Sequence, residues 1–238
     1  MLRKKLWQFL MIFLFFSSCP ARSQGPLGIL ADEIYLPLAQ KLSLKLKATL
    51  IYKSSPDLCD YSRLLIIGPK KYLEAKKIKC PGQKRLVANI LYPSLFRLEE
   101  NEILISPLPS AQSLERFGSK WVVLYSAYLS YYVKHLKAHL RIKEFLLEDH
   151  QSLPEALSRI PEDWTILLLP DPVLLHPKSR KYLKLYLLRK RAKGLDLLGI
   201  EGLPWPRVKY SEEAIFKNIL RALISPESQK IYFCEVFP

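Results

Sequence analysis

Short apolar runs alternate with amphipathic stretches along the chain from residue 25 onward. Each run is rich in aliphatic residues and ends at a turn residue, which is typical of a strand. In the stretches that follow, apolar residues recur at helical spacing, which is typical of a helix packed on one side. This alternation predicts strand–helix–strand units, and such units build parallel β-sheets.

The same pattern gives the positions of the individual elements. We predict strands at residues 27–31, 48–52, 64–68, 86–92, 121–125, 142–147, 164–169, 196–199 and 230–236. We predict four helices that span 72–78, 152–160, 178–191 and 211–224. Two further predicted helices are identified by their apolar residues: one carries Ile34, Leu38 and Leu42, and the other carries Leu129, Val133, Leu136 and Leu140. The helix at 152 has a capping box at its start, because Glu155 stands three positions after Ser152.

The pattern is interrupted between Arg97 and Gly118. Glu, Pro and Ser are frequent in this stretch, and Pro107 and Pro109 argue against a regular element, so we expect an inter-lobe linker here. The predicted fold is α/β, with two small Rossmann-like lobes whose parallel sheets face a cleft. The first lobe would span 24–112 and the second 113–206, and a helix and a strand in 207–238 would complete the lobes.

Residues 1–23 have the features of a secretory signal. The basic segment Met1–Lys5 precedes the apolar run Leu6–Phe16, which is too short to span a bilayer. The residues up to Cys19 resemble a bacterial lipobox, although an aliphatic residue is usual at the position of Phe16. Two routes stay open: lipidation of Cys19 would hold the protein on a membrane, and cleavage after residue 21 or 23 would release it.

Composition and charge narrow the choice of partners. The chain of 238 residues is 49% hydrophobic, which excludes disorder and allows a substantial core. Its formal net charge of +15 admits nucleic acid, anionic lipid or an anionic solute. Because an exported protein meets much anionic membrane surface and little nucleic acid, we keep the membrane surface as a candidate partner and expect no nucleic acid.

Three cysteines remain after the signal, namely Cys59, Cys80 and Cys234. The first two could form a disulfide that closes a loop of about 20 residues. Ordinary buried thiols are equally compatible with the sequence, and the two alternatives stay open at this point.

One apolar segment with a proline-flanked aspartate, Trp164–Leu175, is similar to a segment of ABC-transporter substrate-binding proteins with the class-I periplasmic-binding fold. The flanking pieces follow the order of that family, with a strand like Trp121–Tyr125 before it and a helix like Lys178–Arg191 after it. Arg63–Ala75 also resembles the strand-Gly-Pro-helix unit of the family's first lobe. The resemblance covers roughly residues 60–225, and the compact stretch Gly25–Tyr52 marks a short and divergent member.

The resemblance implies an exported protein, periplasmic or anchored in the membrane through a lipidated Cys19. It would capture a small-molecule solute between its lobes for an ABC-type permease. The alternative is a degenerate binding-protein fold that acts as an envelope interaction module without solute transport. The sequence contains no nucleophile elbow, no Walker loop and no dinucleotide fingerprint, so we expect neither an enzyme nor a cofactor.

In a cleft between two parallel-sheet lobes, ligands meet the carboxyl ends of the strands. Six residues at predicted strand ends are therefore candidate ligand contacts: Asp32, Tyr92, Tyr125, Ser126, Asp171 and Trp205. The aromatic rings would enclose the solute, the serine would donate to an acceptor, and a carboxylate would hold an ammonium or hydroxyl group. Structural alternatives stay open, among them helix capping by Asp171 and a core position for Tyr92.

His135 and His139 stand four positions apart, which places both imidazoles on one face of a helix. The spacing suits a pair of metal ligands, but no third ligand stands beside it. We therefore predict a solvated helix flank with no metal.

Overall fold

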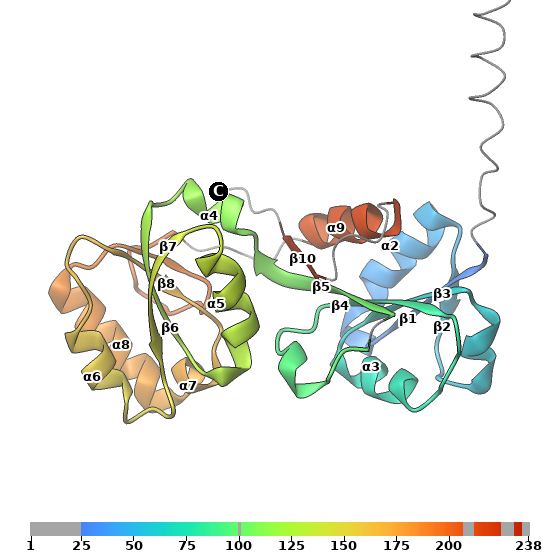
Figure 1. The fold of residues 1–238 in the computed structure, drawn as a ribbon, viewed down its shortest axis with the longest axis horizontal. Helices are drawn as coiled ribbons and strands as arrows, with labels where there is room; N and C mark the ends of the chain where they lie inside the picture. Colours follow the sequence, from blue (N-terminus) through green and yellow to red (C-terminus); the bar gives the residue numbers. More distant parts are fainter. Residues whose placement is uncertain (1–24, 100, 207–211, 225–230, 235–238) are drawn as a thin grey trace, which may run out of the picture.

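A computed structural model describes residues 25–99, 101–206, 212–224 and 231–234 of the chain. Figure 1 shows two lobes, each built from one β-sheet with helices on both sides. Every strand pair that the structure describes is parallel. The predicted α/β fold with two parallel-sheet lobes is therefore confirmed.

The first sheet has six strands in the order β10-β5-β4-β3-β1-β2. Their bounds are β1 (Leu27–Ala31), β2 (Thr49–Ile51), β3 (Arg63–Ile67), β4 (Lys84–Ala88), β5 (Glu102–Pro109) and β10 (Ile231–Cys234). The apolar run from Leu64 to Ile67 in β3 is fully buried, because helices cover both faces of the sheet.

The helices of the first lobe form one layer on each side of this sheet. Their bounds are α2 (Leu36–Leu46), α3 (Pro69–Lys76) and α9 (Glu212–Ile224), with 3-10 helices η1 (Glu33–Tyr35), η2 (Pro56–Asp60) and η3 (Pro93–Leu95). Leu42 of α2 and Ile219 of α9 pack on one face of the sheet. Leu58 of η2 and Tyr72 of α3 pack on the other face.

The second lobe repeats this layered arrangement around four strands in the order β7-β6-β8-β9. Its strands are β6 (Lys120–Tyr125), β7 (Arg141–Leu146), β8 (Thr165–Leu168) and β9 (Gly194–Asp196). Its helices are α4 (Ala111–Glu115), η4 (Ala127–Leu129), α5 (Ser130–Lys137), α6 (Leu153–Ser158), α7 (Pro172–Leu175) and α8 (Pro177–Lys190). Leu157 and Leu183 pack on one face of the sheet, whereas Leu114 and Leu136 pack on the other.

The prediction of a linker without regular structure at 97–118 is wrong, because this stretch contains β5 and α4. β5 pairs with β4 through residues 102–105, ahead of Pro107 and Pro109, so neither proline removes a donor from that ladder. Figure 1 shows β5 running from the first lobe toward α4 in the second. The segment connects the lobes, but it does so as a strand.

Two local predictions also need correction. The strand predicted at 86–92 ends at Ala88, because Asn89 takes a left-handed backbone conformation with φ of 60°. The capping box predicted at the start of α6 does not form. The Ser152 hydroxyl donates to the carbonyl oxygen of Asp149 at 2.7 Å, and the Glu155 carboxylate pairs with Arg159.

The C-terminal helix and strand both belong to the first lobe. In β10, Ile231 lies opposite Leu104 of β5, and α9 packs on the same sheet. The chain therefore leaves the first lobe along β5 and returns to it before α9. The predicted signal at 1–23, with Cys19, lies outside the described residues. No helix in the described ranges is both long and apolar enough to cross a membrane.

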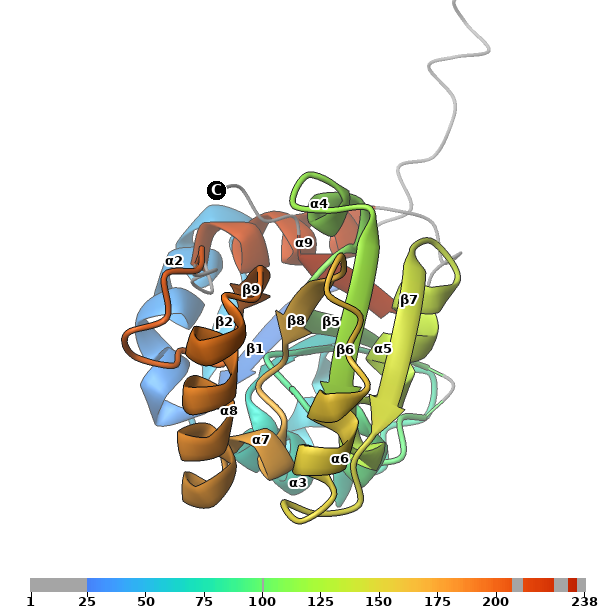
Figure 2. The ribbon, with the colours of Figure 1, turned by 90° about the vertical axis from the view of Figure 1, so that its left-hand side faces the viewer.

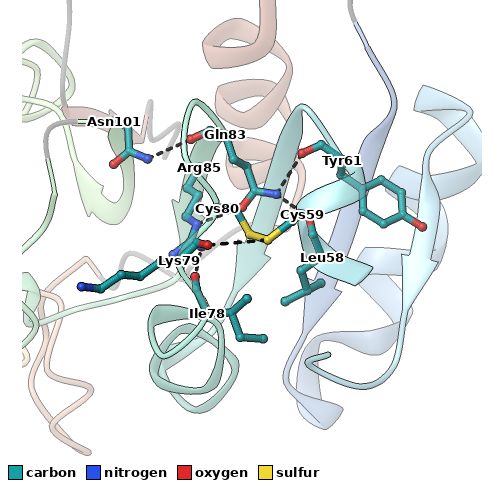
Figure 3. Close-up of a disulfide and its surroundings, with 9 residues drawn as sticks. All are labelled: Leu58, Cys59, Tyr61, Ile78, Lys79, Cys80, Gln83, Arg85 and Asn101. Atoms are coloured by element: carbon teal, nitrogen blue, oxygen red, sulfur yellow. Dashed lines mark hydrogen bonds between the residues drawn. A yellow bond between two sulfur atoms is a disulfide. The ribbon is translucent and has the colours of Figure 1, made fainter. Parts of the chain in front are cut away.

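A disulfide joins Cys59 and Cys80, whose Cα atoms are 5.1 Å apart. Of the two alternatives that the sequence left open, the structure has the disulfide. Figure 3 shows the Gln83 side chain beside it, with Nε2 donating to the carbonyl oxygen of Leu58 at 2.5 Å. The disulfide ties η2 to the segment before β4. Cys234 has a free, buried thiol, and burial raises its pKa to about 12.

Candidate ligand site between the two lobes

A cavity of about 360 Å³ lies where the two lobes meet. Its lining comes from η1, α2 and α9, from β5, and from the loops after β4 and β8: Ile34, Tyr35, Leu38, Asn89, Leu91, Pro107, Pro170, Glu212 and Ile215. Most of this lining is apolar. The second lobe contributes Pro170. The site therefore sits at the carboxyl ends of parallel strands, where ligands of open α/β sheets bind.

Asn89 follows β4 directly and is the buried polar residue of this cavity. It is 9% exposed, and its Oδ1 is buried without a hydrogen-bond partner in the structure. Asn tolerates the left-handed backbone better than most residues, and the Asn89 N–H donates to the carbonyl oxygen of Ile105 at 3.3 Å. A buried acceptor without a partner costs about 1–3 kcal/mol of folding free energy. A ligand that donates to this oxygen would remove that cost.

Glu212 brings a carboxylate to the rim of the cavity. Its side chain is 62% exposed, and the Lys41 ammonium lies 3.3 Å from it. Exposed ion pairs of this kind are weak, so the carboxylate stays accessible to a cationic group. Tyr35 lies in the same lining, where burial and then the Asp32 carboxylate raise the pKa of its phenol. This phenol stays protonated at neutral pH.

Hydrogen bonds between the lobes border the cavity. The Tyr92 hydroxyl donates to the carbonyl oxygen of Pro170 at 2.5 Å, and the Tyr131 hydroxyl donates to that of Leu91 at 3.1 Å. Burial, with a smaller effect of the Asp171 carboxylate, raises the pKa of Tyr92 to about 12. Tyr92, predicted to contact the ligand, thus holds the loop after β8 against the loop after β4.

Asp171 and Ser126, two more predicted ligand contacts, are bonded to each other. The carboxylate of Asp171 is fully buried and accepts from the Ser126 N–H at 2.7 Å and from its hydroxyl at 2.8 Å. It also accepts from the Val173 N–H at 2.9 Å, which caps α7. This carboxylate has the three donors that satisfy it, and it ties the loops after β6 and β8 together.

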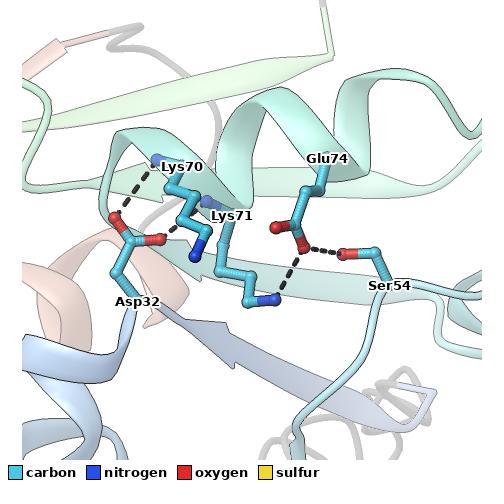
Figure 4. Close-up of polar contacts among 5 residues, drawn as sticks. All are labelled: Asp32, Ser54, Lys70, Lys71 and Glu74. Carbon is cyan, nitrogen blue, oxygen red and sulfur yellow. Dashed lines mark hydrogen bonds and ion pairs between the residues drawn. The ribbon is translucent and has the colours of Figure 1, made fainter.

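Asp32 has a similar internal role in the first lobe. Figure 4 shows its carboxylate accepting from the backbone N–H groups of Lys70 at 3.1 Å and Lys71 at 2.6 Å, at the start of α3. Gly68 precedes this helix with φ of 101°, and a Cβ there would stand 2.4 Å from Oδ2 of Asp32. The Gly-Pro start of α3 is therefore shaped by the approach of this carboxylate.

Tyr125 and Trp205, the last two predicted ligand contacts, form hydrogen bonds within the second lobe. The Tyr125 hydroxyl donates to the Glu144 carboxylate at 2.9 Å, across from β6 to β7. Trp205 donates through Nε1 to the carbonyl oxygen of Ala192 at 2.8 Å and packs against Gly194. It lines a separate cavity of about 320 Å³ near the end of α8.

None of the six predicted residues is part of the lining of the inter-lobe cavity. Their sequence neighbours in the same loops do line the cavity. Ile34 and Tyr35 follow Asp32, Leu91 precedes Tyr92, and Pro170 precedes Asp171. The ligand roles of the six stay predictions. Sequence reasoning missed Asn89, whose one signal was an amide residue inside an apolar run predicted to continue to residue 92.

The histidine pair has an aromatic environment. The rings of His135 and His139 are 5.1 Å apart, and His135 stacks on Phe233 of β10 at 4.0 Å between ring centroids. Burial and then His139 lower the pKa of His135. Within the described ranges, no group of three or more His, Cys, Asp or Glu side chains is placed to hold a metal ion.

No family model and no curated protein matches the chain. Among solved structures, the chain is similar to the ABC domain in complex with L-Trp from Streptococcus pneumoniae. The identity is 13%, the TM-score is 0.43, and the match covers 89% of this chain and 90% of that chain. The chain is also similar to a conserved domain protein from Vibrio cholerae O1 biovar El Tor, at 12% identity and a TM-score of 0.43, and the match covers 90% of this chain and 90% of that chain. A third similar structure is a LacI transcriptional regulator from Lactobacillus brevis, at 11% identity and a TM-score of 0.43, and the match covers 89% of this chain and 98% of that chain.

Proposed function

We propose that this protein is an exported solute-binding protein that captures a small molecule between its two lobes. The observation that carries the proposal is Asn89, a residue of the inter-lobe cavity lining whose buried Oδ1 has no hydrogen-bond partner. Buried polar atoms are nearly always hydrogen-bonded, and this one belongs to a residue that lines a cavity at the carboxyl end of a parallel strand, which supports a bound group.

The lining defines the chemistry of the solute. A volume of about 360 Å³ is at the lower end of the usual size of small-molecule sites. Its walls are mostly apolar, and the polar side chains among its described lining residues are Asn89, Glu212 and the phenol of Tyr35. The solute we infer has an apolar body, an N–H or O–H group that donates to Asn89, and an amino group near Glu212.

Binding would proceed by closure of the lobes and would involve no bond-making chemistry. The chain passes between the lobes along β5 and again between β9 and α9. The hydrogen bond from Tyr92 to Pro170 joins loops of different lobes, so it can form only when they are together. A solute that contacts Asn89 in one lobe and Pro170 in the other favours this closed state.

Export is supported by two independent features of the chain. The basic and apolar segments within residues 1–23 have the composition of a secretory signal. The disulfide between Cys59 and Cys80 is typical of proteins that fold in an oxidising compartment. A lipidated Cys19 would keep the protein beside a membrane permease, as in the ABC-transporter family that Trp164–Leu175 resembles.

The alternative is an envelope interaction module that does not transport a solute. It is favoured by the internal bonds of the six residues predicted at strand ends, and Asp171 in particular has a full set of donors. In that case the cavity would be a packing defect between the lobes.

A thermal-shift screen separates the two functions. The chain from residue 24 would be heated with amino acids, nucleosides, sugars and small anions in turn. We expect a saturable rise in melting temperature with one class that has a donor on an apolar body. The rise should be lost in Asn89→Gly, which suits the backbone at φ of 60°.

The matched control is Lys47→Gly, since Lys47 also has a left-handed backbone, with φ of 51°, and does not line the cavity. It should keep the full shift. A cooperatively folded protein that responds to none of these solutes, or whose response survives in Asn89→Gly, would contradict the solute-binding proposal.

A further inference from the structure

The segment that contains α8 is strongly basic. Eight of the seventeen residues from 177 to 193 are Lys or Arg and none is Asp or Glu: Lys178, Arg180, Lys181, Lys184, Arg189, Lys190, Arg191 and Lys193. They account for more than half of the formal net charge of +15. None of the ion pairs between described residues involves this segment.

Three large apolar side chains lie among these cations. Tyr182, Leu185 and Leu188 are 49%, 62% and 43% exposed, and their spacing of three places them along one side of the helix. The opposite side carries Leu183 and Leu187, which are buried in the core of the second lobe. The helix thus has two apolar sides, of which one packs on the sheet and the other faces outward.

The position of α8 leaves this outward side accessible. Figure 2, which views the molecule from its left-hand end in Figure 1, shows α8 on the near side of the second lobe, away from the first. Near the C-terminal end of the helix, the cavity of about 320 Å³ continues the surface through Leu188, Arg191 and Trp205. α8 contributes no residue to the inter-lobe cavity, so a partner here leaves the solute site open.

We propose that this face, defined by Tyr182, Leu185, Leu188 and the surrounding Lys and Arg residues, docks the protein on an anionic phospholipid bilayer. This role goes beyond solute capture. The cations match the charge of anionic headgroups, and long Lys and Arg side chains can reach the headgroups while their stems lie along apolar surface. Tyr and Leu side chains between them suit the boundary between headgroups and acyl chains.

A bilayer fits these observations better than an acidic protein partner. The cations spread over the whole length of the helix and beyond it to Lys193, and the apolar side chains stand singly between them. A specific protein interface concentrates its apolar anchors in a central patch and keeps charge at the rim. A fluid surface of headgroups requires no fixed pattern, and it can meet Lys178, Lys181 and Arg189, which share the side of the helix that carries Tyr182, Leu185 and Leu188.

Co-sedimentation with lipid vesicles tests the proposal. The chain from residue 24 contains every described element and lacks the apolar run Leu6–Phe16, which could bind lipid by itself. We expect it to sediment with vesicles of equal parts phosphatidylcholine and phosphatidylglycerol, less so at high salt, and not with phosphatidylcholine alone. The double variant Lys181→Gln/Arg189→Gln should bind about fivefold more weakly for each cation removed. Leu185→Ser should show a several-fold loss at constant charge.

Matched controls sit on the first lobe. Lys53→Gln/Lys79→Gln removes two exposed cations, and Leu44→Ser replaces a leucine that is 84% exposed. Both should bind the anionic vesicles as the unmodified chain does. Equal losses in the α8 and first-lobe variants would show general charge attraction and overturn the proposal. Absence of sedimentation with anionic vesicles, or equal sedimentation with both vesicle types, would overturn it as well.

Discussion

Asn89 and Asp171 are buried polar residues that follow interior strands of the two sheets, β4 and β8. They differ in what their side-chain oxygens meet. The Asp171 carboxylate accepts three hydrogen bonds at 2.7–2.9 Å, whereas the Oδ1 of Asn89 accepts none. Burial at the end of a strand therefore does not identify a ligand contact. Under the proposed function, the remaining hydrogen-bonding capacity separates a structural residue such as Asp171 from a residue that binds the solute.

The two residues should respond oppositely to replacement, and this gives the largest expected effect. Asp171→Ala leaves the N–H groups of Ser126 and Val173 and the Ser126 hydroxyl without their acceptor, which should cost about 4 kcal/mol of unfolding free energy. Asn89→Gly removes an oxygen that has no partner and should cost about 1 kcal/mol or less. Urea denaturation monitored by circular dichroism measures both. Equal losses for the two variants would remove the distinction on which the comparison rests.

Loss of the disulfide should destabilise the first lobe and not the second, because Cys59 and Cys80 both lie in the first lobe. Cys59→Ser/Cys80→Ser opens a loop with a sequence separation of 21 and should destabilise the first lobe by about 3 kcal/mol. In hydrogen exchange, protection should fall in β3 and α3 and stay unchanged in β6 and β8. A uniform fall over both sheets would mean that the lobes unfold as one cooperative unit.

The contact between the lobes should contribute less to the free energy of unfolding than the Asp171 carboxylate or the disulfide does. Tyr92→Phe removes the hydroxyl that donates to the Pro170 carbonyl oxygen and keeps the ring, so we expect a loss of about 1 kcal/mol. Because that bond forms only between closed lobes, the radius of gyration in small-angle scattering should increase. Tyr182→Phe on the outside of α8 is the matched control and should change neither quantity.

The smallest effect concerns pH. Burial, and next the proximity of His139, lower the pKa of His135 below its ordinary value of 6.5. As pH falls through about 6.5, the unfolded chain takes up this proton before the folded one does, so the folded state loses stability. The loss continues down to the lower folded-state pKa and is absent above neutral pH. Melting temperatures between about pH 8 and pH 5 should therefore decline less in His135→Phe.

Most of the fold could be predicted because each apolar run alternates with an amphipathic stretch, and this pattern belongs to parallel sheets. The strand β5 was missed for a local reason. Pro107 and Pro109 usually end regular elements, but here they stand beyond the residues that pair with β4. To decide between a disulfide and two free thiols requires the distance between the Cα atoms of Cys59 and Cys80, and their spacing in the sequence does not give that distance.

The site could be predicted only as far as its loops. The rule that ligands meet the carboxyl ends of parallel strands selects the loops after β1, β4 and β8, and residues from all three line the cavity. It also selected Tyr125, Ser126 and Trp205, whose loops contribute no described residue to the lining. It does not say which side chain of a loop turns inward. Asp171 stands out in the sequence between two prolines, whereas Asn89 lies inside an apolar run. Only the positions of the surrounding donor groups show that the first is satisfied and the second is not.

The central claim is that a solute binds by donating to Asn89. Its most direct test is calorimetric titration of the solute found in the thermal-shift screen into the unmodified chain, Asn89→Gly and Lys47→Gly. The account predicts one saturable site in the unmodified chain and in Lys47→Gly, with a loss of about tenfold or more in Asn89→Gly. Equal affinity in all three proteins would contradict it, because the oxygen without a partner would then have no part in binding.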